Sequence, residues 1–349
     1  MQTRIEIPQP DDWHVHLRDD TMLAAVVGYT ARRFRYAMVM PNLVPPVTST
    51  SAARGYRSRI LAHVPSDAPD FRPLMALYCS PAIDVEDLRS GVDEGTVAAV
   101  KYYPAGATTN SGDGGTSMLD FLWLFEALAD LGVRLLVHAE STDPSIDIFD
   151  REVAFLETEL VVVRDRIPEL DITVEHVSTR RGVEFVTEHD RVAGTITPHH
   201  LTRDRSDLLA EGMRPDLYCK PVINSADDRS ALVAVATAAD PSFFLGTDSA
   251  PHPTTAKYGP RASAGVFNAA YGLEVVAEVF ERAGALDRLA AFTSVNGRAV
   301  YGVPSPDHHL RLTRTTIDAD VASTLTTASG EQVVLFGADE AARWTIESV

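Results

Sequence analysis

The sequence is poor in cysteine: Cys79 and Cys219 are the only two in 349 residues. They lie too far apart for a Cys-x-x-Cys metal or redox site, and one pair makes no disulfide framework. Any metal must therefore be held by nitrogen and oxygen. No apolar run approaches 18 residues, and no basic region followed by an apolar one opens the chain, so we expect a cytoplasmic protein without a membrane span.

Positive charge is also scarce. Lys and Arg together number 31 against 49 Asp and Glu, which gives a formal net charge of −18. This argues against a nucleic-acid partner or an anionic membrane, because phosphate binding needs a basic surface. A small anionic substrate remains compatible, since bound divalent cations can reverse the sign of the field locally.

A glycine-rich phosphate turn is missing after the first predicted strand, which disfavours an open doubly wound sheet. Eight short apolar segments instead alternate with helical patterns, and this order predicts parallel strands that close into a (β/α)8 barrel. We expect a barrel over residues 1–303 and a short C-terminal extension over 304–349 packed on it. The expected strands are 13–17, 37–40, 73–79, 97–102, 134–139, 172–177, 193–197 and 243–247, and the expected helices are 51–63, 85–93, 117–131, 151–167, 180–188, 225–238 and 265–283.

His14 and His16 lie two residues apart in the first predicted strand. Alternate residues of a strand face the same side, so both imidazoles could bind one metal ion. Arg18 follows in the same parity, where its guanidinium could hold a substrate carboxylate. Taken alone, a His-x-His is equally compatible with two partly exposed histidines on an edge strand. Whether it forms a metal site depends on ligand residues further along the chain.

Five further strand ends carry polar residues: Asn42, Lys101, His138, His176 and Asp248. The spacing is 37 residues from Lys101 to His138, 38 to His176 and 72 to Asp248, so the last gap leaves room for strand 193–197. Barrel enzymes keep their active sites at the C-terminal ends of the strands. This spacing indicates one shared site.

Lys101 could ligate metal only if it became anionic. A lysine amine kept neutral by burial can react with carbon dioxide, and the resulting carbamate could bridge two metal ions. The two ions would share the remaining ligands, one taking His14, His16 and Asp248 and the other taking His138 and His176. Such a centre keeps a small positive charge, which favours an anionic substrate.

Short motifs contain these residues: His14-Val15-His16-Leu17-Arg18, Met40-Pro41-Asn42, Lys101-Tyr102-Tyr103-Pro104, Val137-His138-Ala139-Glu140, Glu175-His176-Val177-Ser178-Thr179, Gly246-Thr247-Asp248-Ser249-Ala250-Pro251-His252 and, late in the chain, Ser294-Val295-Asn296-Gly297. With this ordered set, the sequence resembles dihydroorotases of the compact bacterial (type II) class in the amidohydrolase superfamily. The similarity spans about residues 11–302.

The resemblance implies a metallo-dependent hydrolase barrel with two Zn²⁺ ions bridged by carboxylated Lys101. It implies the reversible cyclisation of N-carbamoyl-L-aspartate to (S)-dihydroorotate and water, the third step of de novo pyrimidine biosynthesis. In hydrolysis, a bridging hydroxide would attack the ring amide carbonyl, and Asp248 would shuttle the proton to the leaving nitrogen. The family also suggests a homodimer.

The same resemblance assigns substrate contacts. Arg18, Asn42 and His252 would bind the substrate carboxylate, His138 would contact substrate as well as metal, and the backbone at Lys220 and Ala264 would contact the ring. An apolar residue is usual at position 220, so Lys220 departs from the family pattern. A contact from the backbone of Lys220 is compatible with this change, whereas a packing role for its side chain is not expected to be kept.

The segment 104–115 directly follows Lys101 and contains four glycines and the adjacent Thr108 and Thr109. A glycine-rich segment after a catalytic strand can hinge, and the two hydroxyls could donate to a bound anion. We expect a lid loop, and the resemblance supports this. The alternative is an ordinary surface connection.

Other residues have plainer interpretations. His63, His189, His308 and His309 are expected at the solvated surface. His199 and His200 are expected to have supporting or structural roles, and Cys219 is expected to be a buried free thiol.

Two alternative functions stay open at this point. One is another cyclic amidohydrolase, such as a dihydropyrimidinase, hydantoinase or allantoinase; Arg18 and Asn42 favour a ring that carries a carboxylate. The other is a non-catalytic scaffold barrel, which predicts missing ligands, whereas all six positions are filled.

Overall fold

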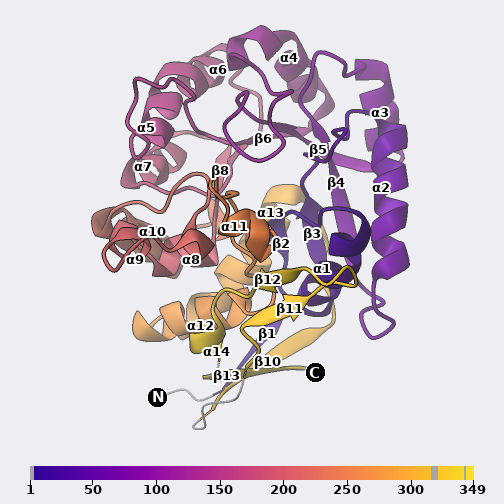
Figure 1. The fold of residues 1–349 in the computed structure, drawn as a ribbon. Helices are drawn as coiled ribbons and strands as arrows, with labels where there is room; N and C mark the ends of the chain where they lie inside the picture. Colours follow the sequence, from indigo (N-terminus) through magenta and orange to yellow (C-terminus); the bar gives the residue numbers. More distant parts are fainter. Residues whose placement is uncertain (1–3, 316–320, 342) are drawn as a thin grey trace.

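A computed structural model describes residues 4–315, 321–341 and 343–349 of the chain. Eight parallel strands form one sheet in sequence order and curve into a barrel, so the predicted fold class is confirmed (Figure 1). The last two strands are buried along their whole length, as expected for parallel strands covered on both faces. The strands are β2 (Asp12–Val15), β3 (Tyr36–Val39), β4 (Arg72–Tyr78), β5 (Val97–Tyr102), β6 (Arg134–Val137), β7 (Ile172–Val174), β8 (Val192–Ile196) and β9 (Phe243–Leu245).

The barrel closes between β2 and the residues that follow β9. Val15 forms a parallel bridge with Ser249. The His16 amide donates to the Ser249 carbonyl at 3.0 Å, and the Asp248 amide donates to the His14 carbonyl at 2.8 Å. The closing hydrogen bonds therefore involve the same residues that carry the predicted metal ligands.

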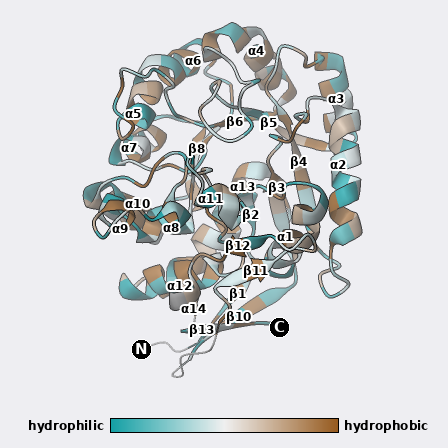
Figure 2. Ribbon diagram, in the orientation of Figure 1, coloured by the Kyte–Doolittle hydropathy of each residue, from teal (hydrophilic) through white to brown (hydrophobic). Residues whose placement is uncertain are grey.

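Helices surround the sheet. The predicted helices 85–93 and 180–188 have the predicted bounds, and the other five are present with shifted bounds. The longer ones are α1 (Asp20–Arg33), α2 (Thr50–His63), α3 (Val85–Asp93), α4 (Leu122–Leu131), α5 (Arg151–Phe155), α6 (Val161–Arg166), α7 (Arg180–Glu188), α10 (Ala226–Thr237) and α12 (Gly272–Arg282). Shorter turns are η1 (Met118–Phe121), η2 (Leu156–Leu160), α8 (Pro198–Thr202), α9 (Arg205–Leu209), η3 (Pro215–Leu217), α11 (Thr254–Lys257), η4 (Leu286–Arg288), η5 (Ala291–Val295), α13 (Asn296–Tyr301) and α14 (Ala338–Ala341). Figure 2 shows hydrophobic residues along the barrel strands and polar residues on the outer helix faces.

Several helical segments differ from the sequence prediction. The short helices α8, α9, α11, α13 and α14 were not predicted, the predicted helix 117–131 begins with the 3-10 turn η1, and three longer segments also differ. Helix α1 was not predicted, because Val26, Val27 and Gly28 have low helix propensity; burial of the two valines against the barrel overrides it. The predicted helix 151–167 contains a π turn, η2, between α5 and α6. The predicted helix 265–283 begins only at Gly272, because residues before it form a bridge and hydrogen bonds beside β9.

Helix α13 explains the late motif that ends in Gly297. The Tyr301 ring stacks on Trp13 of β2 with centroids 4.2 Å apart. A Cβ at Gly297 would lie 2.0 Å from the Trp13 ring nitrogen. Only glycine therefore lets α13 approach the start of β2 this closely.

A small antiparallel sheet joins the two ends of the chain: β1 (Arg4–Pro8), β10 (His309–Arg314) and β13 (Trp344–Ser348) (Figure 1). A separate hairpin consists of β11 (Thr324–Thr326) and β12 (Gln332–Val334). The division of the chain at residues 303 and 304 stays a prediction, and by pairing β1 belongs with the strands of the extension. Across the described residues, no helix combines the length and apolarity that a membrane crossing needs.

Candidate active site

All six predicted metal ligands lie at the C-terminal end of the barrel, and all six are buried. His14 lies in β2 and Lys101 in β5, and His16 and His138 directly follow β2 and β6. His176 lies two residues after the end of β7, and Asp248 lies three residues after the end of β9. Three residues of the site have left-handed backbone angles: Arg18 (φ 58°), His176 (φ 43°) and Asp248 (φ 45°). Such conformations cost roughly 1–3 kcal/mol each and gather at functional sites.

The first ligand group consists of His14, His16 and Asp248. The Nε2 atoms of the two histidines are 3.2 Å apart, and Asp248 Oδ1 lies 3.3 Å from His14 Nε2 and 3.1 Å from His16 Nε2. A tetrahedral ion with bonds of about 2.0–2.1 Å separates its ligand atoms by about 3.3–3.4 Å. These residues therefore fit one metal ion.

Electrostatics suit the first group to that role. Burial lowers the pKa of His16 to about 4, although Asp248 opposes the shift, so this imidazole is neutral and free to ligate. Burial alone would raise the pKa of the Asp248 carboxyl, but the neighbouring His14 and His16 outweigh it and hold the pKa well below its usual range. Asp248 is therefore present as a carboxylate.

The second group pairs His138 with His176. His138 Nδ1 lies 3.0 Å from His176 Nε2, and the rings of His176 and His14 are 5.1 Å apart between centroids. Burial lowers the pKa of both His138 and His176. Two neutral imidazoles thus face a second position close to the first, which fits a second ion.

Lys101 interacts electrostatically with residues of both groups. Its side chain is 0% exposed, and its Nζ has no hydrogen-bond partner among the described residues. The nearest aromatic contact is the Tyr103 ring, 5.0 Å from Nζ. Burial lowers the pKa of Lys101 to about 8, against the opposing charges of Glu175 and Asp248. An orphaned and easily neutralised amine is the group that carboxylation requires.

Two carboxylates that support the histidines were not singled out from the sequence. Glu175 Oε2 accepts from His14 Nδ1 at 2.5 Å and from Thr195 Oγ1 at 3.0 Å. Glu140 Oε2 accepts from His138 Nε2 at 2.9 Å. Each hydrogen bond keeps the ring proton on the nitrogen that faces the carboxylate. The other ring nitrogen then has its lone pair free for a metal ion. Both could have been found in the sequence as acidic residues one or two positions from a predicted ligand histidine at the end of an apolar segment.

Asp12 is a third residue that the sequence did not reveal. Its carboxylate accepts from the Thr247 amide at 2.8 Å, from Thr247 Oγ1 at 2.6 Å and from the His14 amide at 3.2 Å. It thereby ties β2 to the segment that carries Asp248. Burial raises the pKa of this carboxyl to about 7, although these hydrogen bonds oppose the shift.

The predicted substrate contacts line a small cavity beside the ligands. Its volume is about 10 Å³, roughly what one water molecule needs. The lining includes four predicted ligand histidines and Asp248, together with Arg18, Asn42, Thr108, Thr109, Lys220 and Ala264. His252 lies at its edge, where its Nε2 is 2.9 Å from both Arg18 Nη2 and the Ala264 carbonyl oxygen.

The nitrogen of His252 cannot serve both neighbours at once. Burial, then the charge of Arg18, lowers the pKa of His252 to about 3, so the imidazole is neutral. Its Nε2 either accepts from Arg18 or donates to Ala264. A substrate carboxylate could take the Arg18 donors and leave His252 to one partner.

The glycine-rich segment 104–115 lies over this cavity. Thr109 Oγ1 donates to the Ala264 carbonyl at 3.3 Å, Asn42 Nδ2 donates to the Thr109 carbonyl at 2.9 Å, and Asn110 Nδ2 donates to the Asn42 carbonyl at 3.1 Å. A Cβ at Gly114 would lie 2.4 Å from the Tyr103 carbonyl oxygen, so this glycine permits close packing. The segment therefore bonds to residues predicted to bind substrate.

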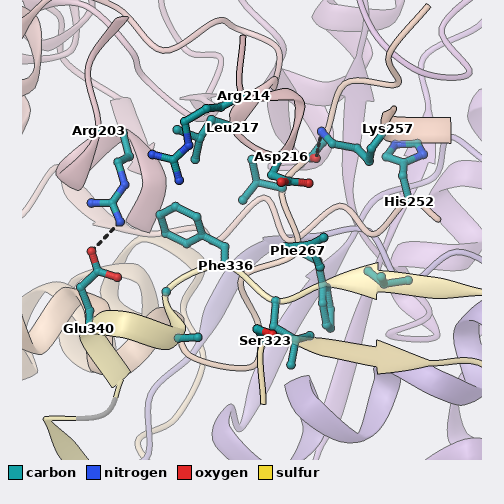
Figure 3. Close-up of a pocket in the computed structure, with 17 residues that line it drawn as sticks. Arg203, Arg214, Asp216, Leu217, His252, Lys257, Phe267, Ser323, Phe336 and Glu340 are labelled. Carbon is teal, nitrogen blue, oxygen red and sulfur yellow. Dashed lines mark hydrogen bonds and ion pairs between the residues drawn. The ribbon is translucent and has the colours of Figure 1, made fainter. Parts of the chain in front are cut away.

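A larger cavity of about 180 Å³ shares Gly265 with the small one (Figure 3). Lys257 and His252 lie beside each other on one of its walls, and Arg203 pairs with Glu340 on another. Lys257 Nζ donates to the carbonyl oxygens of Tyr218, Ser263 and Gly265 at 2.9, 3.1 and 2.7 Å. This lysine thus fixes the backbone on both sides of Ala264.

His199, His200 and Cys219 are buried and hydrogen-bonded, and their supporting roles stay predictions; among the histidines expected at the surface, one lies elsewhere. His199 bonds to Asn268, His200 bonds to Thr197 and to the Pro221 carbonyl, and the buried Cys219 thiol donates to that same carbonyl at 3.2 Å. Burial raises the pKa of Cys219 above its usual value.

The exception is His189, expected at the solvated surface together with His63, His308 and His309. His189 is half-buried, with its ring tilted by 30° against the Phe185 ring at 4.2 Å between centroids, whereas the other three are exposed. The surface prediction was therefore wrong for His189, because the end of α7 turns this ring onto its own helix.

Comparisons with known proteins agree with this geometry. No model of a protein family matches the chain. A dihydroorotase from Synechococcus sp. (strain CC9605) is 50% identical over 315 residues, which cover 90% of each chain. The crystal structure of dihydroorotase from Campylobacter jejuni superposes with a TM-score of 0.90 at 32% identity, over 99% of this chain and 98% of that one. Dihydroorotase from Saccharomyces cerevisiae, in complex with 5-fluoroorotic acid, gives a TM-score of 0.90 at 27% identity, over 99% of both chains. The chain therefore belongs to the dihydroorotase family of the amidohydrolase superfamily.

Proposed function

We propose that this chain is a dihydroorotase that interconverts N-carbamoyl-L-aspartate and (S)-dihydroorotate, the third step of de novo pyrimidine biosynthesis. The observation that carries the proposal is the buried set of six predicted ligand residues, five of which line one cavity together with Arg18. Family membership at 50% identity supports the same reaction.

The donor set fits two divalent metal ions, which we propose are Zn²⁺. His14, His16 and Asp248 would hold one, His138 and His176 the other, and carboxylated Lys101 would bridge them. Such a pair lowers the pKa of a bound water and polarises a carbonyl. The ligand separations of 3.0–3.3 Å and the orphaned Lys101 amine support this assignment.

The chain's own residues would do the remaining work. Asp248 is a carboxylate at the metal position and can take a proton and return it to the leaving ring nitrogen. The substrate carboxylate would be bound by Arg18, Asn42 and His252, while Lys220 and Ala264 offer backbone groups to the ring.

We propose that segment 104–115 is a lid. In this conformation Thr109 bonds to Ala264 and to Asn42, so the segment is already docked on the predicted substrate contacts. A substrate needs far more room than 10 Å³, so entry requires this segment to move. The predicted homodimer and the cytoplasmic location stay predictions.

The other cyclic amidohydrolases and the scaffold barrel explain the site less well. A dihydropyrimidinase or allantoinase substrate has no ring carboxylate for Arg18 and His252, which meet at 2.9 Å on the cavity edge. A scaffold has no need of six complete ligand positions with supporting carboxylates.

A direct assay tests the proposal. The purified protein is offered dihydroorotate, carbamoyl aspartate, dihydrouracil and allantoin in parallel, and its metal content is measured on the same sample. We expect turnover of the first two only, with two zinc ions per chain. Turnover of dihydrouracil or allantoin at a matching rate would contradict the assignment.

A further inference from the structure

Lysine is used sparingly in this chain and only near the active site. Of the 31 basic residues, three are lysines: Lys101, Lys220 and Lys257. Lys101 lies among the predicted ligands, Lys257 bonds to the backbone around Ala264, and Lys220 lines the small cavity. The first is explained by its place among the predicted ligands and the second by its backbone hydrogen bonds. The third has neither explanation, so its contacts are considered in turn.

The Lys220 side chain is committed to one partner. Its Nζ lies 2.7 Å from Glu140 Oε1, and the two side chains are only 11% and 2% exposed. The other oxygen of Glu140 accepts from His138 Nε2 at 2.9 Å. Each carboxylate oxygen therefore has one bonded neighbour, a cation on one side and an imidazole on the other.

This chain of contacts ends at a predicted metal position. Because His138 Nε2 donates to Glu140, its Nδ1 holds the lone pair, and Nδ1 faces His176 Nε2 at 3.0 Å. Partners of this kind fix the tautomer and the ring orientation of a metal-binding histidine. Glu140 can do so only while its oxygen is held in place beside the ring.

A buried carboxylate without a counter-charge is strongly unfavourable, and the Glu140 side chain is only 2% exposed. We propose that Lys220 is a positioning residue: its ammonium neutralises and fixes Glu140, so that Glu140 holds His138 ready for the second metal ion. This inference rests on the proposed function for the identity of the site. It concerns metal binding, and therefore can be tested without turnover.

A cycle of variants tests it. Lys220→Met removes the ammonium, Glu140→Gln removes the charge but keeps an oxygen for His138, and the double variant removes both. Lys220→Arg is the conservative control, because a guanidinium can still pair with Glu140. Affinity for the second ion is measured by zinc titration of metal-free protein against a chromophoric chelator, and kcat and KM are measured with dihydroorotate.

We expect Lys220→Met to lower the affinity for the second ion about 10–100-fold, the usual range for partners of metal ligands. It should also lower kcat at zinc concentrations that leave the second site partly filled. The double variant should regain most of the lost affinity, because no orphan charge remains, and Lys220→Arg should stay within a few-fold of wild type. Folding is checked on each variant by circular dichroism. If Lys220→Met does not fold, Lys220→Arg and Glu140→Gln still decide, since both should bind the second ion within a few-fold of wild type.

A different pattern would overturn the inference. Unchanged zinc affinity with a raised KM in Lys220→Met would make Lys220 a direct substrate contact. Losses that simply add in the double variant would show that Lys220 and Glu140 act separately, and tenfold weaker zinc binding in Lys220→Arg would show that charge pairing is not what matters. If the wild-type protein binds two ions but does not turn over dihydroorotate, only the proposed function is refuted. The zinc titrations would still test the role of Lys220.

Discussion

Replacing Lys101 with methionine tests the metal bridge and the burial argument together. Methionine matches the length and apolar character of the lysine stem but cannot form a carbamate. The variant should therefore lose bound metal and nearly all activity. When both proteins are metal-free, however, the variant should be more stable towards unfolding than wild type.

The size of that gain follows from the pKa. Burial lowers the pKa of Lys101 from 10.5 to about 8, and at 1.36 kcal/mol per unit this corresponds to roughly 3 kcal/mol. The penalty is fully present below about pH 8, where the folded protein must bury an ammonium. It declines as the pH rises from about 8 towards 10.5, because the folded state is then already neutral while the unfolded state is still charged.

The assay compares thermal midpoints of metal-free wild type and Lys101→Met from pH 7 to pH 10. The variant should melt several degrees higher at pH 7, and the difference should shrink with rising pH. Lys257→Met is the matched control, because burial lowers the pKa of Lys257 to about 8 as well. Unlike Lys101, its ammonium donates three hydrogen bonds to carbonyls, so its loss should lower the midpoint. Incubation with ¹³C-bicarbonate and zinc should give a carbamate carbon signal in wild type alone.

Two outcomes would refute this reasoning. A Lys101→Met protein that keeps two metals and full activity would remove the carbamate from the mechanism. A metal-free variant that is less stable than wild type at pH 7 would show that the Lys101 ammonium has a favourable partner, contrary to its orphaned position.

Four further predictions concern single steps of the proposed reaction. Asp248→Asn should cost at least the 10²–10⁴-fold typical of general acid–base catalysis and abolish the acid limb of the hydrolysis pH profile; an unchanged limb in a metal-replete variant would indicate another base. Arg18→Lys should weaken binding and catalysis with metal content and Tm nearly unchanged, and equal wild-type activity on rings with and without a carboxylate would contradict the role of Arg18. The double variant Thr108→Ala, Thr109→Val should lower kcat as well as raise KM and leave metal content alone; wild-type constants would make segment 104–115 a simple connector. Glu175→Gln should weaken the ion held by His14 about 10–100-fold in chelator competition, and full affinity would mean that the 2.5 Å contact with His14 Nδ1 does not orient the ring.

The barrel and the common location of the predicted ligands could be predicted because both depend on local rules. The two-residue period of a strand relates His14 to His16, and the repeat of one strand and one helix relates Lys101, His138 and His176. Even where strands ended early, as before His176 and Asp248, the ligands remained at the same end of the barrel. Position along the chain was sufficient for these residues.

The supporting residues could not be predicted in this way. Glu175 and His176 are adjacent, yet Glu175 reaches His14 of β2, which is 161 residues away. The ion pair of Lys220 with Glu140 likewise joins segments 80 residues apart. Such contacts depend on the direction of side chains in the closed barrel, which no spacing in the sequence determines.

The small sheet of β1, β10 and β13 has a consequence for the order in which the protein can be made. Ile7 pairs with Leu310, 303 residues later, so β1 leaves the ribosome long before its partner strand exists. Closing a loop of that length costs about 5 kcal/mol from its logarithmic dependence on length, offset by burial of Ile5, Ile7, Leu310 and Leu312. The barrel strands β2 to β9 are complete by residue 245, so the barrel can close first while β1 waits unpaired. A nascent chain stalled before β10 would therefore expose Ile5 and Ile7 on a free strand edge, where they could pair with another chain.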